Sequence, residues 1–205
     1  PRKLRFLPSA DENKSADPML TEKKKKIIKV IKKCSIKYSL EDPGMKNLIK
    51  FLIIGEDRRF YYHHGIDILS IIRAIYKNIF YSCHEGASTI DQQLVRVITG
   101  DYSHTLARKI KEIFLAIWTD NKFPKNTIAL SYLTISYYGT DYYNLALILK
   151  KFHERIDEYI DDEICAEIIA RLKYPEPRNV SIARRKKIAI RKNYILKLKI
   201  KYHDK

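Results

Sequence analysis

Apolar residues recur three and four positions apart through most of this chain, and this spacing limits the folds open to it. The segments with this spacing are 45–54, 66–81, 90–98, 106–118, 126–138, 156–172 and a basic stretch after Pro177. Segment 66–81 has a broad apolar face, which is typical of a helix packed in a core. The 205 residues include only 6 Gly and 7 Pro, and strand signals are sparse, so the chain is predicted to be mainly α.

The N-terminal part of the chain lacks this clear helical spacing. Residues 1–22 mix Pro, Ser, Asp, Asn and Lys without periodicity, as in an extended or disordered arm. Between residues 27 and 38, β-branched residues alternate loosely with Lys, which is compatible with a short strand or a surface helix. We therefore expect a partly disordered basic arm at 1–41, one folded domain at 42–200 and a short tail at 201–205.

The charge balance points to an acidic partner without identifying it. The sequence has 40 Lys and Arg against 24 Asp and Glu, a formal net charge of +16. Nucleic acid, an anionic membrane and a phosphorylated substrate all satisfy such a charge, and so do solvated basic faces with no specific role. Charge alone does not choose among these readings.

The sequence supports neither a cysteine framework nor a membrane span. Cys34, Cys83 and Cys165 are widely spaced and form no C-x-x-C pair, so neither a zinc site nor a disulfide framework is predicted. No apolar run reaches the roughly 18 to 20 residues that cross a bilayer. The chain as given is expected to be soluble or peripheral; it begins at Pro1 without Met, which leaves room for an upstream anchor.

Charged and aromatic residues are concentrated between positions 56 and 67. Within this cluster stand Glu56, Asp57, Phe60, His63 and Gly65. Composition alone favours an exposed loop, and only the spacing of these residues points to a functional site.

A second polar cluster follows Gly86 and leads into the predicted helix at 90–98. Its hydroxyls, amides and guanidinium group suit sugars and phosphate oxygens, and Ser88 or Thr89 is also a good helix N-cap. The members that carry this chemistry are Ser88, Thr89, Gln92, Gln93 and Arg96.

A third cluster places Arg108, Lys109 and Glu112 on one predicted helix. Taken alone, Arg108 and Glu112 form an ordinary ion pair four residues apart, worth about 0.3 to 0.5 kcal/mol. Guanidinium and ammonium groups also bind phosphate, so the same residues can contact a phosphorylated substrate.

These clusters, in this order, resemble the signatures of the peptidoglycan glycosyltransferases, glycosyltransferase family 51. The family patterns are E-D-x-x-F-x-x-H-x-G, G-x-S-T-x-x-Q-Q-x-x-K/R and R-K-x-x-E, and the stretch from Lys125 to Leu133 is similar to the family's K-x-x-I-L-E-x-Y-L-N. The resemblance covers residues 42–138 well and the remainder, to about residue 196, loosely. The chain departs from the family pattern at Asp91, Val97, Asp120, Leu130 and Thr134.

The resemblance implies a lysozyme-like globular lobe with a smaller membrane-facing lobe, placed between the first two signatures or just after them, and a cleft between the lobes. It implies two catalytic acidic residues: Glu56 as general base, and Glu112, which orients Arg108 or the donor. We expect them to face one another across a cleft lined by Arg108 and Lys109. The implied substrate-binding residues are Asp57, Phe60, His63, Gly65, Ser88, Thr89, Gln92, Gln93, Arg96, Arg108 and Lys109.

The same resemblance implies that the chain polymerises lipid II into β-1,4 glycan strands with release of polyprenyl diphosphate. No metal site formed by the protein and no obligatory cofactor is expected, although Mg²⁺ or Mn²⁺ at the diphosphate is compatible with it. The implied partners are lipid II, nascent glycan, an anionic membrane surface and other cell-wall synthesis proteins. The implied location is the extracytoplasmic face of the bacterial inner membrane, where segments 27–38 and 68–81 are candidates for contact with lipid.

Two alternative functions stay open at this point. A degenerate relative could bind a lipid-linked precursor or a cell-wall partner without polymerising it, as the departures at Val97, Leu130 and Thr134 suggest. A nucleic-acid-binding module would use the net charge, but the basic residues form no recognisable reading helix, so no nucleic-acid partner is expected.

Overall fold

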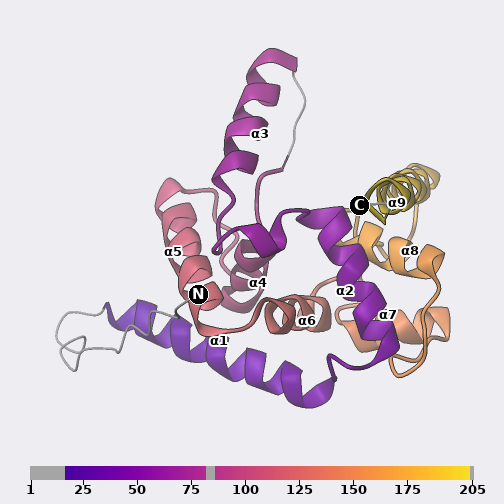
Figure 1. Cartoon of the computed structure of the whole chain (residues 1–205), viewed down its shortest axis with the longest axis horizontal. Coiled ribbons are helices and arrows are strands. Elements are labelled where there is room, and N and C mark those ends of the chain that lie inside the picture. Colours follow the sequence, from indigo (N-terminus) through magenta and orange to yellow (C-terminus); the bar gives the residue numbers. More distant parts are fainter. Residues whose placement is uncertain (1–16, 82–85, 204–205) are drawn as a thin grey trace.

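The computed structural model describes residues 17–81 and 86–203, which fold into nine α-helices and one short 3-10 helix (Figure 1). The described residues contain only isolated β-bridges and no sheet, so the predicted mainly α class is confirmed, and the architecture is consistent with the expected lysozyme-like lobe. The elements are α1 (Pro18–Lys37), α2 (Pro43–Glu56), η1 (Phe60–Tyr62), α3 (Ile68–Tyr81), α4 (Ile90–Thr99), α5 (Leu106–Lys122), α6 (Lys125–Ile135), α7 (Leu145–Phe152), α8 (Asp162–Lys173) and α9 (Ile182–His203).

Helix α6 lies at the centre of the core, between α1, α2 and α4. Every residue from Ile128 to Thr134 is buried, so the helix meets neighbours on all sides. Two buried hydroxyls donate to carbonyls one turn earlier: Ser131 to Thr127 at 2.7 Å and Thr134 to Leu130 at 2.7 Å. This pairing lets polar side chains lie in an apolar core without unsatisfied groups.

Helix α1 belongs to the packed domain, in contrast to the basic arm expected over 1–41. Asp17 caps it by accepting from the backbone of Met19, and Ile27, Ile31 and Cys34 are buried against α6 and α4. Segment 27–38 is therefore helical up to Lys37 rather than a strand, and Ile27, Ile31 and Cys34 face the core, whereas Ile36 is exposed. The core begins upstream of residue 42, where the sequence predicted the domain to start, while residues 1–16 lie outside the described chain.

Helix α3 corrects the expectation that segment 66–81 packs in the core. The helix projects away from the other helices (Figure 1), and Ile72 and Ile79 are 58% and 68% exposed. Ile68, Leu69, Tyr76 and Phe80 are exposed as well. Apolar periodicity shows that a helix has one apolar face, but it does not show whether another part of the chain covers that face.

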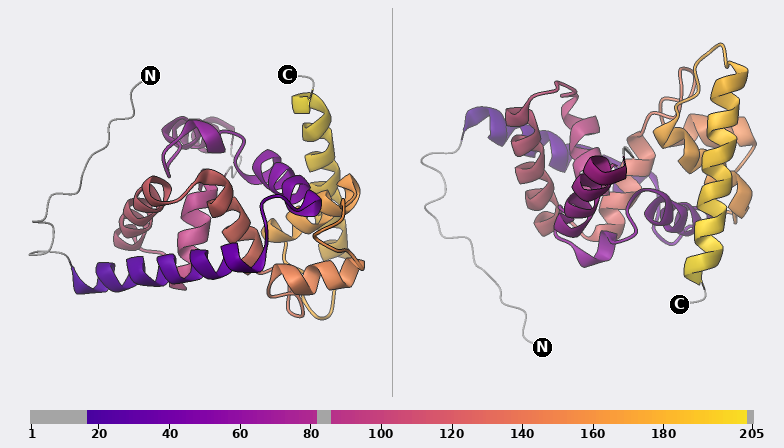
Figure 2. Two further views of the ribbon diagram at one scale, coloured as in Figure 1. Left: turned by 60° about the horizontal axis from the view of Figure 1, so that its bottom comes forward. Right: turned by 90° about the horizontal axis from the view of Figure 1, so that it is seen from above.

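The C-terminal part contains α7, α8 and α9. Helix α8 begins at Asp162 and not at residue 156, because Asp161 caps it by accepting from the backbone N–H of Glu163 at 2.7 Å. Helix α7 was not predicted from the sequence. Helix α9 packs on α8 and α2 and lies at the opposite end of the molecule from α5 (Figure 2).

Two sequence expectations concern membranes and cysteines. Within 17–81 and 86–203, no helix combines the length and the apolar character that crossing a bilayer requires. Cys34 and Cys165 are buried free thiols, whereas Cys83 lies outside the described residues.

Candidate active site

A cleft of about 1210 Å³ opens beside the C-terminal end of α2, between the base of α3 and the α8–α9 pair. Glu56 and Asp57 line it, as do four residues of the second cluster: Ser88, Thr89, Gln93 and Arg96. The first two clusters, 30 residues apart in sequence, therefore meet at one cavity. Among the described residues, eight basic side chains line the cleft: Arg58, Arg59, Arg73, Lys77, Arg96, Lys173, Lys187 and Arg191.

Glu56 is the last residue of α2 and lies at the wall of this cleft. Its Oε1 atom is 3.0 Å from Nη2 of Arg191, and its side chain is 13% exposed. The same Nη2 donates to the carbonyl of Gly55 at 2.6 Å. The carboxylate is thus ion-paired, but beside a large cavity that a substrate can enter.

Asp57 joins the two signature segments. Its Oδ2 atom accepts from His63 Nε2 at 2.9 Å and from the backbone N–H of Ile90 at 3.1 Å. Because Asp57 follows Glu56 directly, the bond from Ile90 holds the Glu56 backbone relative to the start of α4, and the bond from His63 holds it relative to the loop after η1. Asp57 therefore shapes the site as well as lining it.

Phe60, His63 and Gly65 support the loop without lining the cleft. Phe60 is buried in the core, and Gly65 has a φ of 77° with its ideal Cβ position 2.6 Å from the backbone nitrogen of Ile117. Only glycine tolerates both the left-handed conformation and this approach to α5. The carbonyl of Gly65 accepts from Thr89 Oγ1 at 2.8 Å, which ties the loop to α4.

Thr89 confirms the predicted N-cap of α4. It forms a capping box with Gln92, whose backbone and side chain are both engaged in the cap. Gln92 is buried and does not line the cleft, whereas Gln93 does and accepts from the hydroxyl of Tyr132 at 2.5 Å. Of the two predicted amides, Gln93 is therefore the one available to a ligand.

Glu112 is the centre of a buried cationic cluster. Arg96 binds it in a bidentate manner at 2.8 and 2.9 Å, Arg108 at 2.5 Å and Lys109 at 2.7 Å. Burial on its own would raise the pKa of Glu112, but the hydrogen bonds and charges of Arg96 and Lys109 outweigh it and lower the pKa to about 2. The reading of this motif as a solvated ion pair is therefore wrong.

The position of this cluster corrects the expected arrangement of the cleft. Glu112, Arg108 and Lys109 do not line it; they lie behind Ser88, whose hydroxyl is 3.2 Å from Lys109 Nζ and 3.4 Å from Arg96 Nη2. Glu56 and Glu112 therefore do not face one another across the cavity. Arg96 extends from the cluster to the cavity wall and connects the two.

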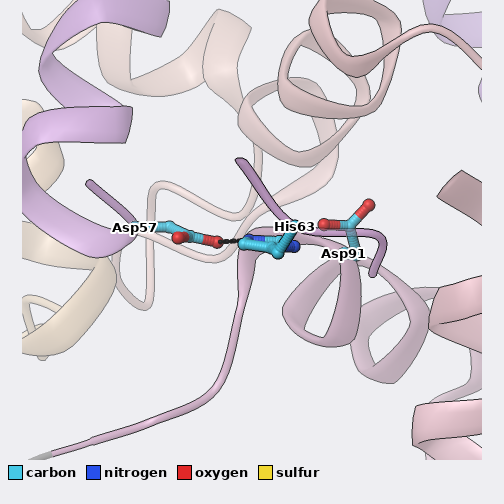
Figure 3. A group of neighbouring side chains, drawn as sticks. All are labelled: Asp57, His63 and Asp91. Atoms are coloured by element: carbon cyan, nitrogen blue, oxygen red, sulfur yellow. Dashed lines mark hydrogen bonds and ion pairs between the residues drawn. The ribbon is translucent and has the colours of Figure 1, made fainter. Parts of the chain in front are cut away.

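Asp57, His63 and Asp91 form a second buried group, with nitrogen and oxygen atoms within 4.8 Å of one another (Figure 3). The imidazole lies between the two carboxylates and bonds Asp57 through Nε2, so the three side chains do not converge on one point. Lys125 Nζ already lies 3.2 Å from Asp91 and supplies positive charge there. The arrangement is a hydrogen-bonded pair, Asp57 with His63, next to an ion pair, Asp91 with Lys125, and it suits a metal ion poorly.

The buried carboxylate of Asp91 lowers the stability of the folded protein at neutral pH, and a single substitution should remove this effect. Burial raises its pKa from 3.8 to about 6, so stability present below pH 3.8 is lost as the pH rises through 6. We expect Asp91→Asn to raise the free energy of unfolding at pH 7 by about 3 kcal/mol, and by much less at pH 4. Urea unfolding at both pH values measures this, and an equal change at both would contradict it.

Arg191 is the main site residue that the sequence analysis missed. It lies 135 positions from Glu56, and only the packing of α9 against α2 brings them together. Its one sequence signal was membership of a basic C-terminal helix, which indicates charge but no partner.

Comparison with known proteins places most of the chain in one family. The sequence profile described as Transglycosylase matches residues 25–199. The monofunctional glycosyltransferase of Staphylococcus saprophyticus is 39% identical over 93 residues, which are 45% of this chain and 34% of that protein. The namesake from Staphylococcus epidermidis is 39% identical over 103 residues, or 50% and 38% of the two chains.

Penicillin-binding protein 1A of Rickettsia typhi is 36% identical over 139 residues, which are 65% of this chain and 18% of that protein. The matched segment thus spans little more than a third of the monofunctional relatives and under a fifth of the penicillin-binding protein.

Proposed function

Because the chain belongs to the transglycosylase family, whose signatures its motifs resemble, we propose that it polymerises peptidoglycan from lipid II and uses Glu56 as the general base. The observation that carries the proposal is the placement of Glu56 at the wall of a large cleft that eight basic side chains line. A carboxylate beside many cations suits a reaction that activates a hydroxyl and releases a diphosphate.

In the proposed reaction, Glu56 takes the proton of the 4-hydroxyl of one lipid-linked disaccharide as its oxygen attacks the anomeric carbon of the growing chain. The bond between that carbon and the diphosphate breaks, and polyprenyl diphosphate leaves with the bonding electrons. Attack opposite an α-linked diphosphate inverts the carbon and creates a β-1,4 linkage. A diphosphate needs no proton to leave when cations meet its charge, so one carboxylate suffices.

We assign the contact with the diphosphate to Arg96 rather than to Arg108 or Lys109. Arg96 lines the cleft, and Glu112 binds its guanidinium through two hydrogen bonds, which orients it. Arg108 and Lys109 bind the same carboxylate but do not line the cleft. They can therefore influence a substrate only through Glu112 and Arg96. Glu112 therefore positions a cation and does not take a proton.

A Mg²⁺ or Mn²⁺ ion, in this proposal, binds through diphosphate oxygens rather than in a protein cage. The cleft carboxylates already have partners: Glu56 pairs with Arg191, Asp57 with His63, and Asp67 with Arg59 and Ser70. Magnesium keeps several waters and commonly binds with substrate phosphates, so this mode requires no dedicated ligand set.

We propose that α3 forms the membrane-facing lobe, since its apolar side chains project from the body beside the cleft. A polyprenyl tail stays in the bilayer, so the cleft must approach the membrane surface, which for this family is the extracytoplasmic face of the inner membrane. Basic residues elsewhere on the chain would favour anionic headgroups.

Replacing Ile72 and Ile79 together by Glu should weaken binding to vesicles of anionic phospholipid by about tenfold or more, because two apolar contacts are replaced by charges that lipid headgroups repel. Co-sedimentation measures the change. The matched control replaces Ile182 and Ile200 of α9, which are also exposed, by Glu. Equal losses in the two double variants would contradict a specific role for α3.

The departures from the family pattern favour an active enzyme over a degenerate relative. Leu130 and Thr134 are buried in α6 and Val97 packs against the core, so none of the three lines the cleft. They change the packing of the domain rather than the groups that meet a substrate.

The proposal is tested by incubating the purified chain with lipid II in detergent. The products are then resolved by gel electrophoresis. A ladder of glycan strands is expected. Retention of lipid II without any polymer would instead support the binding-only relative. A shift of duplex DNA that falls with salt, in the absence of polymer, would support a nucleic-acid partner.

A further inference from the structure

The proposed base stands at an electrostatically unfavourable point of its helix. Glu56 is the last residue of α2, where the helix dipole presents partial negative charge and the final carbonyls lack helical partners. Within the first and last turns, a carboxylate is favoured at the N-terminus and disfavoured at the C-terminus. A cation from another part of the chain would offset this unfavourable charge, and a donor there would satisfy an open helix carbonyl.

One nitrogen atom of Arg191 contacts both the carboxylate of Glu56 and the open carbonyl of Gly55. Nη2 carries two N–H bonds; one donates to the carbonyl of Gly55 at 2.6 Å and the other to Oε1 of Glu56 at 3.0 Å. One guanidinium thereby satisfies an open helix carbonyl and offsets the charge next to it. The two bonds also fix the carboxylate relative to its own backbone, which a single ion pair would not do.

The packing of α9 holds Arg191 in this position. Ile195, one turn further along α9, is fully buried, and its Cδ1 lies 3.4 Å from where a Cβ of Gly55 would stand. Ile169 of α8 lies 3.0 Å from the same point, so the end of α2 is in close contact with both helices. The side chain of Arg191 is only 14% exposed, so few other orientations are open to it.

We propose that Arg191 is the positioning residue for Glu56, an assignment that rests on the proposed function. It holds the carboxylate in a fixed orientation at the cleft wall before the acceptor hydroxyl arrives. Lysine is a poor substitute, since an ammonium group is a point charge on a flexible stem and does not fix the relative orientation of two acceptors. Small errors in the placement of a reacting group cost about a hundredfold in rate.

The test compares Arg191→Ala and Arg191→Lys with the control Lys192→Ala in the glycan polymerisation assay. Lys192 is the next residue of α9, but it pairs with Glu163 and Glu167 away from the cleft. We expect Arg191→Ala to lower kcat about 30- to 100-fold with KM within threefold of wild type. Arg191→Lys should recover less than a tenth of the lost activity, and Lys192→Ala should match wild type.

Rescue with guanidinium at tens of millimolar separates positioning from folding. Free guanidinium should raise the activity of Arg191→Ala at least fivefold, because it can enter the space left by the side chain and bridge the same two oxygens. It should not raise the activity of Lys192→Ala. Arg191→Lys keeps the charge and provides the kcat comparison if the alanine variant does not fold.

Several outcomes would overturn the inference. One is a kcat of Arg191→Ala within twofold of wild type, and another is a rise in KM with unchanged kcat. A third is the absence of guanidinium rescue. Faster turnover of Arg191→Ala would also overturn it, because it would mean that the ion pair restrains Glu56. If the wild type polymerises glycan, Glu56→Gln is inactive and Arg191→Ala is unaffected, the role of Arg191 is wrong but the proposed function stands. Absence of polymer from the wild-type chain would remove the proposed function and this role with it.

Discussion

Glu56→Gln should lower kcat for glycan polymerisation by a factor of about 10² to 10⁴, the usual contribution of a general base. The amide oxygen of Gln can still accept from Arg191, so the side chain keeps its place at the end of α2. What is lost is the ability to take up the proton of the acceptor hydroxyl. Initial rates with purified lipid II measure the loss, while retention of lipid II on the immobilised variant should be unchanged.

The matched control is Glu158→Gln. Glu158 lies on the surface and pairs with the exposed Arg155, so its charge is removed without touching the cleft. It should keep wild-type activity and thermal stability. Activity of Glu56→Gln above a tenth of wild type would show that another group accepts the proton.

Local sequence patterns predicted most helices because their cause is local. The capping box of Thr89 and Gln92 and the apolar stripes of α2 and α5 involve residues within one or two turns of each other. Helices α1 and α3 show what local patterns do not predict, namely how a helix packs. Both carry apolar faces, yet α1 is covered by α6 whereas α3 projects from the body, and that difference depends on the tertiary structure.

The candidate site shows the same division. The motifs contain the carboxylates, but each carboxylate owes its environment to a distant partner. Arg191 reaches Glu56 from α9, and Arg96 reaches Glu112 from α4. An ion pair across 135 residues leaves no periodic trace in a single sequence, so the sequence predicted the acidic groups and missed the contact between Arg191 and Glu56.

Glu112→Gln should lower the free energy of unfolding at pH 7 by about 3 kcal/mol. The folded protein lowers the pKa of Glu112 from 4.5 to about 2, and one pKa unit corresponds to about 1.4 kcal/mol. The neutral amide would leave three cations without their shared anion: Arg96, Arg108 and Lys109. Because these cations are only partly exposed to water, removing the anion that they share leaves part of their desolvation cost uncompensated.

The pH dependence distinguishes this cause from a simple loss of packing. Because the folded-state pKa is depressed, the stabilisation is complete above about pH 4.5 and is lost as the pH falls through about 2. The gap between wild type and Glu112→Gln in urea unfolding should therefore be constant from pH 7 to pH 5 and shrink at pH 3. Glu41→Gln, which removes an exposed partner of Lys46, should change neither value measurably. A gap that stays the same at pH 3 would mean that Glu112 stabilises the domain through its shape and hydrogen bonds, and not through the charge that it shares with Arg96.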